Sequence, residues 1–342
     1  MCALKNVNKN KKIGGCIIMK NLFVSDIHGY DENLTNQLME IIKNDLPDKV
    51  ICLGDINGSP ELDAMQPIFY NKIVNYMKAL LKTNQNPTDD EILSFPTSKG
   101  KTISDGVKEL WNFIHQIYDN FEPINTANYA KELVQYTHYG HFISCLPIQV
   151  TDIIKKHMIE SVKKTLSVLS KFADAGSEVI ILEGNWDISS PVDFYSNPVE
   201  CKRLPVKNRA LYLKDFVRNT DPRIYFIHKI TEIEDENNYF VFLPFDEAIN
   251  YQFEEIKQPK TDKQIVLISH AQVSWSAIKG DVAMTGEGKK IEENMNIILH
   301  DLLPDTVIHG HLHDKANDYN VLMEEKSIKV FYLPKGTARF IY

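Results

Sequence analysis

The sequence has no long apolar run, no closely spaced cysteine pair and no excess of positive charge. Because a membrane-spanning helix needs about 20 mainly apolar residues, no transmembrane helix or membrane partner is predicted. The five scattered cysteines favour reduced structural thiols and a cytoplasmic protein over a disulfide framework. A formal net charge of -8 argues against a nucleic-acid coat protein, which is normally basic.

The first 19 residues lack the pattern of a targeting segment. Residues 13–16 resemble a lipoprotein cleavage box, but residues 6–12, which precede it, are polar and basic instead of apolar. We predict a disordered tail over residues 1–19, with Met19 as an alternative start to Met1. The rest of the chain, with 43% hydrophobic residues overall, suits one large domain or two smaller ones.

Several short apolar runs with β character are followed directly by polar residues that can bind metal ions. The runs are residues 21–25, 49–53, 178–182, 265–269 and 305–308. A helical pattern over residues 31–43 joins the first two, which predicts a βαβ unit and a parallel sheet with its site at the carboxyl ends of the strands. The metal-capable residues after the runs are Asp26, His28, Asp55, Asn185, His270, His311 and His313.

Residues 60–175 interrupt this pattern with helical stretches, notably 68–81 and 107–121, and with polar loops that contain proline. A long amphipathic helix over residues 151–173 follows, with Gly176 as its cap. We predict a core domain made of residues 20–59 and 176–342. The helical insertion and its connecting core helix (60–175) would cap the site, or could equally mediate contacts in an oligomer.

The later part of the chain is predicted to complete the core. Residues 223–227 and 239–243 are predicted as strands of a hairpin around the acidic turn 232–238. Residues 279–288 form a glycine-rich loop, 291–302 a helix, and 328–333 and 338–342 the last strands. Gly310-His311-x-His313 places two imidazoles on a tight turn that ends the apolar run 305–308. Because alternate residues on an extended backbone point the same way, His311 and His313 could reach two adjacent metal ions.

The mixture of carboxylates, imidazoles and one amide suits borderline divalent ions such as Mn, Fe, Zn or Co. Two such ions held about 3.5–4 Å apart can clamp a phosphoryl group for in-line attack. The residues that we expect to take part most directly in catalysis are Asp55, Asn185, His270 and Asp187.

The five motifs, in this order, resemble those of the calcineurin-like metallophosphoesterase superfamily. They are Asp26-x-His28, Gly54-Asp55-x-x-Gly58, Gly184-Asn185-x-Asp187, His270 alone, and Gly310-His311-x-His313. The resemblance covers residues 20–59 and 176–342 and implies an α/β fold, a four-layer α/β/β/α sandwich. It also implies that Asp26, His28 and His313 hold one metal, that Asn185, His270 and His311 hold another, and that Asp55 bridges them. Manganese is the favoured ion, and a metal-bridging hydroxide would be the nucleophile.

Two departures from the family pattern bear on the substrate. Many members carry histidine after the asparagine, where this chain has Trp186, and an indole cannot shuttle a proton at neutral pH. Some small phosphodiesterases of the family carry cysteine there, so activity can survive the loss. The arginines typical of protein phosphatases are also missing after Asp55 and Asp187.

We therefore expect a phosphate-ester substrate, with phosphodiesters such as a small nucleotide or cyclic nucleotide favoured. The alternatives are a catalytically idle binding scaffold on the same fold and a phosphomonoesterase or protein phosphatase.

Some residues have two interpretations in the sequence alone. Asp187 could orient a ligand through a hydrogen bond or cap a helix that begins after it. Trp186 could be a stacking platform for a base or a plug in the pocket. His309 is expected to pack on the opposite face. His138 and His141, within the insertion, favour a locally packed loop, and the alternative is that one of them swings over the site as a proton donor.

Overall fold

The computed structural model describes residues 19–58, 60–117, 148–187, 206–252, 255–274, 286–313 and 317–341. Its strands are β1 (Asn21–Ser25), β2 (Lys49–Cys52), β3 (Glu178–Leu182), β4 (Ile224–Ile227), β5 (Thr231–Glu234), β6 (Asn238–Leu243), β7 (Gln264–Ser269), β8 (Thr306–His309), β9 (Tyr319–Met323), β10 (Lys326–Tyr332) and β11 (Thr337–Ile341). Its helices are α1 (Glu32–Asn44), α2 (Pro60–Phe69), the π-helix η1 (Tyr70–Val74), α3 (Asn75–Thr83), α4 (Asp89–Ser94), the short 3-10 helix η2 (Ser98–Gly100), α5 (Ile103–Ile117), α8 (Ile148–Ala175), α10 (Val206–Thr220), α11 (Phe245–Ile249) and α13 (Gly286–Leu302).

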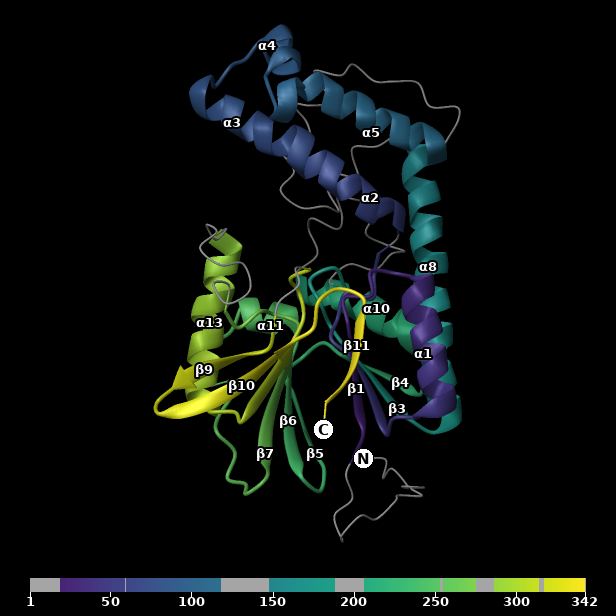
Figure 1. Cartoon of the computed structure of the whole chain (residues 1–342), viewed down its shortest axis with the longest axis vertical. Coiled ribbons are helices and arrows are strands. Elements are labelled where there is room, and N and C mark those ends of the chain that lie inside the picture. Colours follow the sequence, from purple (N-terminus) through teal and green to yellow (C-terminus); the bar gives the residue numbers. More distant parts are fainter. Residues whose placement is uncertain are drawn as a thin grey trace.

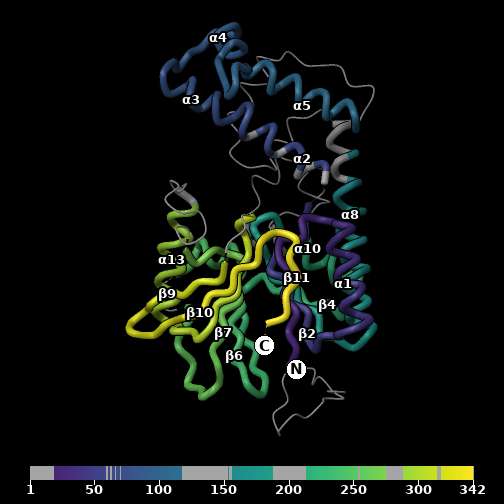
Figure 2. Tube along the Cα trace, viewed as in Figure 1, coloured from purple at the N-terminus to yellow at the C-terminus, as the bar shows by residue number. Residues whose placement is uncertain are grey.

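The strands form two mixed sheets. One sheet has the order β11-β1-β2-β3-β4, and the other has the order β5-β6-β7-β8-β10-β9. In the first sheet β1 to β4 are parallel, and β11 pairs with β1 in the antiparallel sense, so that the two ends of the core lie side by side (Figure 2). In the second sheet β6, β7, β8 and β10 are parallel between antiparallel edge strands. Because these strands are parallel, the residues that follow them lie together at the carboxyl ends of the strands in each sheet.

Helices cover the outer faces of both sheets, which confirms the predicted α/β/β/α sandwich (Figure 1). Residues of β1 show why its apolar run is continuous. Leu22 and Val24 pack outward against helices α1, α8 and α10, whereas Phe23 points into the apolar layer between the two sheets. A strand buried on both faces needs apolar side chains at every position. On the far side, α11 and α13 cover the second sheet.

The helices before residue 118 have an apolar core of their own. This core contains buried residues of α2, α3, α4 and α5, including Phe69, Met77 and Trp111. Figure 1 shows these helices beyond the ends of the strands, joined to the sandwich by the long helix α8. Met158 on α8 packs into this helical core, whereas Val162 packs into the core beneath the first sheet. One continuous helix therefore contributes to both apolar cores.

The boundaries of the predicted helices change where proline and π-helical geometry intervene. The helix expected over residues 68–81 begins at Pro60, contains Pro67, and passes through η1 before α3. Proline removes a backbone donor and π-helical turns break the regular spacing, so the apolar periodicity is clear only in the later part. Helix α8 ends as predicted at Gly176, whose φ of +105° suits a residue without a side chain.

The predicted hairpin between residues 223–227 and 239–243 is wrong. These two segments are β4 and β6, and they belong to different sheets. The antiparallel partner of β6 is β5, with Thr231 opposite Phe242 and Glu234 opposite Tyr239. Part of this strand falls in the predicted acidic turn because its sequence, Thr-Glu-Ile-Glu, is polar at three of four positions. As an edge strand, β5 exposes its glutamates to solvent and still pairs with β6.

Within the described ranges, no helix is long and apolar enough to cross a membrane. Cys52 is a buried free thiol at the end of β2. The other four cysteines and residues 1–18 of the predicted tail over residues 1–19 lie outside the described residues.

Candidate metal centre

The seven metal-capable residues meet where the strands of both sheets end. Asp26 and His28 follow β1, Asp55 follows β2 and Asn185 follows β3, all from the first sheet. The second sheet supplies the residues after β7 and β8, namely His270, His311 and His313. The centre therefore forms across the gap between the two layers, and neither sheet alone contains it.

One group of three donors consists of Asp26, His28 and His313, whose ligand atoms lie within 4.8 Å of one another. The two Nε2 atoms of His28 and His313 are 3.1 Å apart, and His313 Nε2 is 3.8 Å from Asp26 Oδ1. Asp26 and His28 are buried, whereas 41% of the His313 side chain is exposed. The centre is consequently open to solvent on the His313 side.

A second group consists of Asn185, His270 and His311. Asn185 Oδ1 lies 2.8 Å from His270 Nε2 and 3.0 Å from His311 Nδ1. The same two ring nitrogens are 3.2 Å from each other. Three potential ligand atoms thus converge on one point from β3, β7 and the turn after β8.

Asp55 lies between the two groups. Its Oδ2 atom is 3.4 Å from His28 Nε2 and 3.3 Å from His270 Nε2, one histidine from each group. Its Oδ1 atom accepts a hydrogen bond of 2.8 Å from the backbone N–H of Trp186. A single carboxylate oxygen is therefore placed to serve both groups.

The donor chemistry of this cluster fits divalent metal ions. His270 points Nε2 at the other donors, while its Nδ1 donates a hydrogen bond of 2.7 Å to the Leu53 carbonyl oxygen. Histidine ligands commonly have this second hydrogen bond, because it fixes which nitrogen faces the metal. Burial holds the pKa of His28 well below its usual value and lowers that of His311 to about 3, so both rings are neutral. Neutral imidazoles beside carboxylates could hold metal ions.

Buried charges in the centre are balanced against one another. Burial opposes ionisation of Asp55, but the charge and hydrogen bond of His270 pull the pKa of Asp55 below its usual value. Burial likewise opposes the charged form of His270, yet Asp55 and Asp26 raise the pKa of His270 to about 9. Burial raises the pKa of Asp26 to about 6. A cation at this position would replace the stabilisation that the His270 charge gives to the two carboxylates.

Four of these residues adopt left-handed backbone conformations. The φ angles are +46° at Asp26, +48° at His28, +53° at Asp55 and +77° at His311. Such values are uncommon outside glycine and cost roughly 1–3 kcal/mol each unless the surrounding structure imposes them. Four such residues in one cluster indicate that the interactions among their side chains outweigh the cost of the left-handed backbone.

Residues 310–313 form the predicted turn, with a left-handed residue in place of extended backbone. Strand β8 ends at His309, and the left-handed turn at His311 follows. Because of this turn His311 joins the group with Asn185, while His313 joins the group with His28. The backbone N–H of His311 also donates to both oxygens of Asp26, at 3.1 and 3.2 Å.

Two glycines permit the close approach of the carboxylates. A Cβ atom at Gly184 would collide with the carboxylate and backbone nitrogen of Asp55. A Cβ atom at Gly310 would collide with Ser25 Oγ and with the carboxylate of Asp26. Both motifs therefore need glycine because another residue's ligand occupies the space of its side chain.

Replacement of Gly184 by alanine should displace Asp55. We expect a loss of about 1–3 kcal/mol in the free energy of unfolding from overpacking, with metal affinity lower by about 10–100-fold. Gly176→Ala is the control, because its new methyl group would meet nothing within 4 Å although the backbone there is strained. Denaturant unfolding and metal titration measure the two effects. Equal metal affinity in the two variants would contradict this explanation.

Asp187 holds two of the loops together. Its Oδ1 accepts the backbone N–H of Asn57 and its Oδ2 that of Gly184, each at 3.0 Å. Asn57 in turn donates its side-chain N–H to the Trp186 carbonyl oxygen at 3.1 Å. Both Asp187 oxygens thus contact backbone amides beside Asp55 and Asn185, so Asp187 is placed as a positioning residue. Residues 188–205, where a helix capped by Asp187 would begin, lie outside the described residues.

Asp187→Asn should weaken metal binding without removing a ligand. The new amide nitrogen would face a backbone N–H, so one of the two loops loses its hydrogen bond. We expect about 10–100-fold lower metal affinity, measured by titration of the metal-free protein. Asp235→Asn is the matched control, because Asp235 Oδ1 also accepts two backbone N–H groups, from Asn237 and Asn238, in a turn at the opposite end of β6. An equally large effect in the control would contradict the positioning role.

Of the other rings singled out in the sequence, Trp186 packs against the centre and His309 does not. The half-buried Trp186 ring packs edge-on against His28, with ring centroids 4.9 Å apart. His309 is buried on the other face, as expected, where its Nε2 accepts from the Tyr319 hydroxyl at 2.9 Å and burial lowers its pKa to about 4. Residues 118–147, which contain His138 and His141, lie outside the described residues.

The sequence did not single out Phe245 or Glu183. The Phe245 ring lies 5.6 Å from the His270 ring and 5.0 Å from the His311 ring, between centroids. Glu183, directly before the Gly184 motif, is buried, and burial with the nearby charge of Asp246 raises its pKa to about 9. Their positions just after strands were the available signal, and an aromatic or glutamate at a strand end is too common to be informative alone.

A cavity of about 560 Å³ adjoins the first group. It is lined by His28, Tyr30 and Lys335, together with residues of the first turns of α1. The positive charge of Lys335 is close enough to His28 to contribute to its lowered pKa. This cavity therefore brings a candidate metal ligand, His28, together with a cationic side chain, Lys335.

Comparisons with known proteins do not assign the chain to a family. No protein-family model matches the chain, and no curated protein matches it. A solved structure matches with 12% sequence identity and a TM-score of 0.43, and the match covers 94% of each chain. A likeness this distant supports no argument about function. The two-sheet sandwich and its buried aspartate and histidine cluster are themselves consistent with a metallophosphoesterase.

Proposed function

We propose that the protein is a calcineurin-like phosphoesterase that uses two divalent metal ions and prefers phosphodiesters. The observation that carries the proposal is the position of Asp55 Oδ2, 3.4 Å from His28 and 3.3 Å from His270. These two histidines belong to separate groups of three donors. A carboxylate placed between two groups of donors could contact one metal ion in each group.

The chain supplies ligands for each ion from both sheets. Asp26, His28 and His313 would hold one ion, Asn185, His270 and His311 the other, and Asp55 would contact both. Manganese is the favoured ion for this mixed oxygen and nitrogen set. When bound, the ions would activate a water molecule for attack on phosphorus and neutralise charge on the phosphoryl oxygens.

Residues beside the ligands would position the ester. Lys335, on the rim of the cavity next to His28, would attract an anionic phosphate oxygen. The cavity volume of about 560 Å³ accommodates an organic group the size of a nucleoside, and the half-buried Tyr30 in its wall offers an aromatic face. These features support a small nucleotide or cyclic nucleotide as the substrate class.

Trp186 disfavours simple alkyl monoesters as substrates, relative to phosphodiesters or activated phosphates. Its indole N–H can donate a hydrogen bond but cannot transfer a proton at neutral pH. An ester whose leaving group departs without protonation would therefore react faster than a simple alkyl monoester. The catalytically idle scaffold is disfavoured because all seven ligand positions are filled and their side chains converge.

The test is hydrolysis of a bis-aryl phosphodiester and of the matching aryl monoester by the protein loaded with manganese. We expect a higher kcat/KM for the diester. Because both esters lose the same aryl group, the ratio of the two kcat/KM values reports the preference for the ester class and does not depend on protonation of the leaving group. Chelation should abolish turnover and added manganese should restore it. A faster monoester reaction would contradict the diester preference. Absence of turnover with bound metal would favour the scaffold.

A further inference from the structure

A cavity of about 500 Å³ lies along strand β4 at the side of the sandwich. Strand β4 ends the first sheet and pairs with β3, while the next strand in the chain, β5, belongs to the second sheet. The cavity is lined by residues of β3, β4, β5 and α10, together with the turn before β4. Among the described strands, none joins β4 to β5, so the cavity opens where backbone hydrogen bonds leave the side of the sandwich uncovered.

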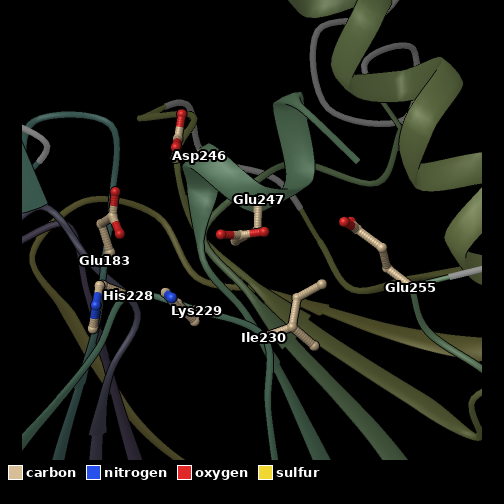
Figure 3. Close-up of a pocket in the computed structure, with 7 residues that line it drawn as sticks. All are labelled: Glu183, His228, Lys229, Ile230, Asp246, Glu247 and Glu255. Carbon is tan, nitrogen blue, oxygen red and sulfur yellow. The ribbon is translucent and has the colours of Figure 1, made fainter. Parts of the chain in front are cut away.

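This cavity is separate from the metal centre. Ile227, the last residue of β4, accepts the backbone N–H of Glu183 at 2.9 Å. The residues that follow, His228 and Lys229, line a different cavity together with Glu183 (Figure 3). None of the seven candidate metal ligands lines the cavity along β4. Its ligand can therefore be sought without metal ions or turnover.

Most of the lining is apolar and comes from both faces of the first sheet. Ile180 and Ile227 belong to the layer between the sheets, whereas Phe226 packs with α10 on the other face. Tyr225, between Ile224 and Phe226 on β4, is 42% exposed. Small-molecule sites of about 300–1,000 Å³ are typically lined in this way, by apolar and aromatic side chains with a few polar groups. The apolar lining residues are Ile180, Ile224, Tyr225, Phe226, Ile227 and Ile233.

Helix α10 adds two positive charges to this lining. Leu213 and Val217 bury their side chains in the core with Phe226, and the residues directly after them, Lys214 and Arg218, line the cavity. Residues four apart lie on one face of a helix, with Cβ atoms about 5–6 Å apart. Like charges at this spacing repel each other, so an anion bound between them would relieve the repulsion.

The carboxylates near the cavity do not neutralise this pair of cations. Glu178, which belongs to the lining, pairs with Lys49. Asp215, next to Lys214 in the sequence, is exposed and does not line the cavity. Within the described part of the chain, Lys214 and Arg218 form no ion pair and no side-chain hydrogen bond. Both positive charges are therefore available to a ligand.

An apolar wall with cations on one side suits an alkyl chain that carries an anionic head group. Strand β4 has four residues, which span about 13 Å at the rise of an extended strand, enough for an alkyl chain of medium length. So short an edge strand offers few backbone groups to an added peptide strand. The guanidinium of Arg218 can donate two parallel N–H groups to a carboxylate or a phosphate, and Lys214 supplies a second charge.

We propose that the cavity along β4 binds a single amphipathic anion. Its alkyl chain lies against the apolar wall around Tyr225, and its head group lies between Lys214 and Arg218. Carboxylates and phosphates share the chemistry that these two cations recognise, so a fatty acid and an alkyl phosphate are the two sources of the anion. The site is independent of the proposed phosphoesterase function.

The first experiment measures binding of decanoate to the full chain by calorimetry, at concentrations where decanoate forms no micelles. We expect one molecule to bind. The double variant Lys214→Gln/Arg218→Gln should weaken binding at least about tenfold, because it removes two charge-assisted contacts. Tyr225→Ala should weaken it about tenfold through lost apolar contact. Lys290→Gln, an exposed change on α13, is the control and should bind like the unaltered protein.

The second experiment compares decanoate with decyl phosphate and with decyltrimethylammonium, which has the same chain and a positive head group. The anion that binds more tightly identifies the source. No measurable binding of either anion, or equal binding of an anion to the double variant and to Lys290→Gln, would overturn the proposal. Equally tight binding of the cation would also overturn it, because apolar contact alone would then explain the result.

Two further outcomes would assign the cavity to another occupant and so contradict the proposal. One is that neither anion binds, whereas a peptide of alternating valine and glutamate binds and loses affinity in the double variant; the occupant would then be an added strand. The other is a dimer in sedimentation experiments that dissociates in Tyr225→Ala, which would show that a second copy of the chain covers the cavity.

Discussion

Under the proposed function, the Asp55→Asn protein should lose nearly all hydrolysis of a phosphodiester and bind at most one metal ion tightly. Asparagine keeps the shape of the side chain, but a neutral amide cannot supply the negative charge that now lies between His28 and His270. It also turns either an N–H₂ group or a weaker oxygen toward the metals. We expect turnover of a bis-aryl phosphodiester to fall by at least about 10²–10³-fold, as when a main electrostatic contact of an active site is removed.

The control for this variant is Asp45→Asn, which makes the same chemical change at the end of α1. Asp45 is partly exposed and pairs with Lys20 at the surface. Exposed ion pairs contribute about 0–1 kcal/mol, so activity and metal content should stay unchanged. Metal content after dialysis, measured by elemental analysis, is read beside the rate. Full turnover with two bound ions in Asp55→Asn would rule out the bridging role.

The Phe242→Ala protein should be about 3–5 kcal/mol less stable to unfolding, the usual cost of deleting a buried phenyl ring. Phe242 is 1% exposed and lies in the apolar layer between the two sheets, with the Phe240 ring 6.3 Å away between centroids. Strand β6, which carries Phe242, is hydrogen-bonded to β5 on one side and to β7 on the other. The two sheets therefore cannot move together far enough to fill the space that the ring leaves. Unfolding in guanidinium chloride measures the change.

Tyr225→Ala is the matched control, because it removes another aromatic ring from a strand, β4, where 42% of the residue is exposed. Little apolar surface is lost from the core there, so we expect a change below about 1 kcal/mol. Similar losses in the two variants would mean that the layer between the sheets contributes less to stability than its burial indicates. A changed dependence on denaturant in Phe242→Ala would indicate an altered unfolded or native ensemble.

The buried strands were predictable because their environment leaves little choice of residue. In β1 the successive residues Leu22, Phe23 and Val24 face two different apolar layers, so a continuous apolar run is required. The polar residues that end such a run, as Asp26 ends β1, must then lie at the edge of the sheet. A parallel sheet with the candidate site at the carboxyl ends of its strands could therefore be inferred before any coordinates, whereas the four-layer sandwich was implied by the family resemblance.

Edge strands and turns were less predictable. Strand β5 alternates between exposed and half-buried residues, so its composition resembles that of a surface turn, and its pairing with β6 depends on where the chain crosses between the sheets. The left-handed backbone at His311 could not be inferred either. Histidine rarely prefers that conformation, and it is held there by the hydrogen bonds from its N–H to Asp26, 285 positions away in the chain.

The sequence by itself determined which residues end the buried strands, because apolar periodicity and burial are local properties of a segment. Only the tertiary structure decided how those residues combine. The pairing of His28 with His313 and of Asn185 with His270 arises from packing one sheet on the other. The same holds for Glu183, which is an ordinary glutamate in the sequence. Among the described residues its buried carboxyl group has no hydrogen-bond partner, and its backbone carbonyl oxygen accepts the N–H of Phe245 in α11.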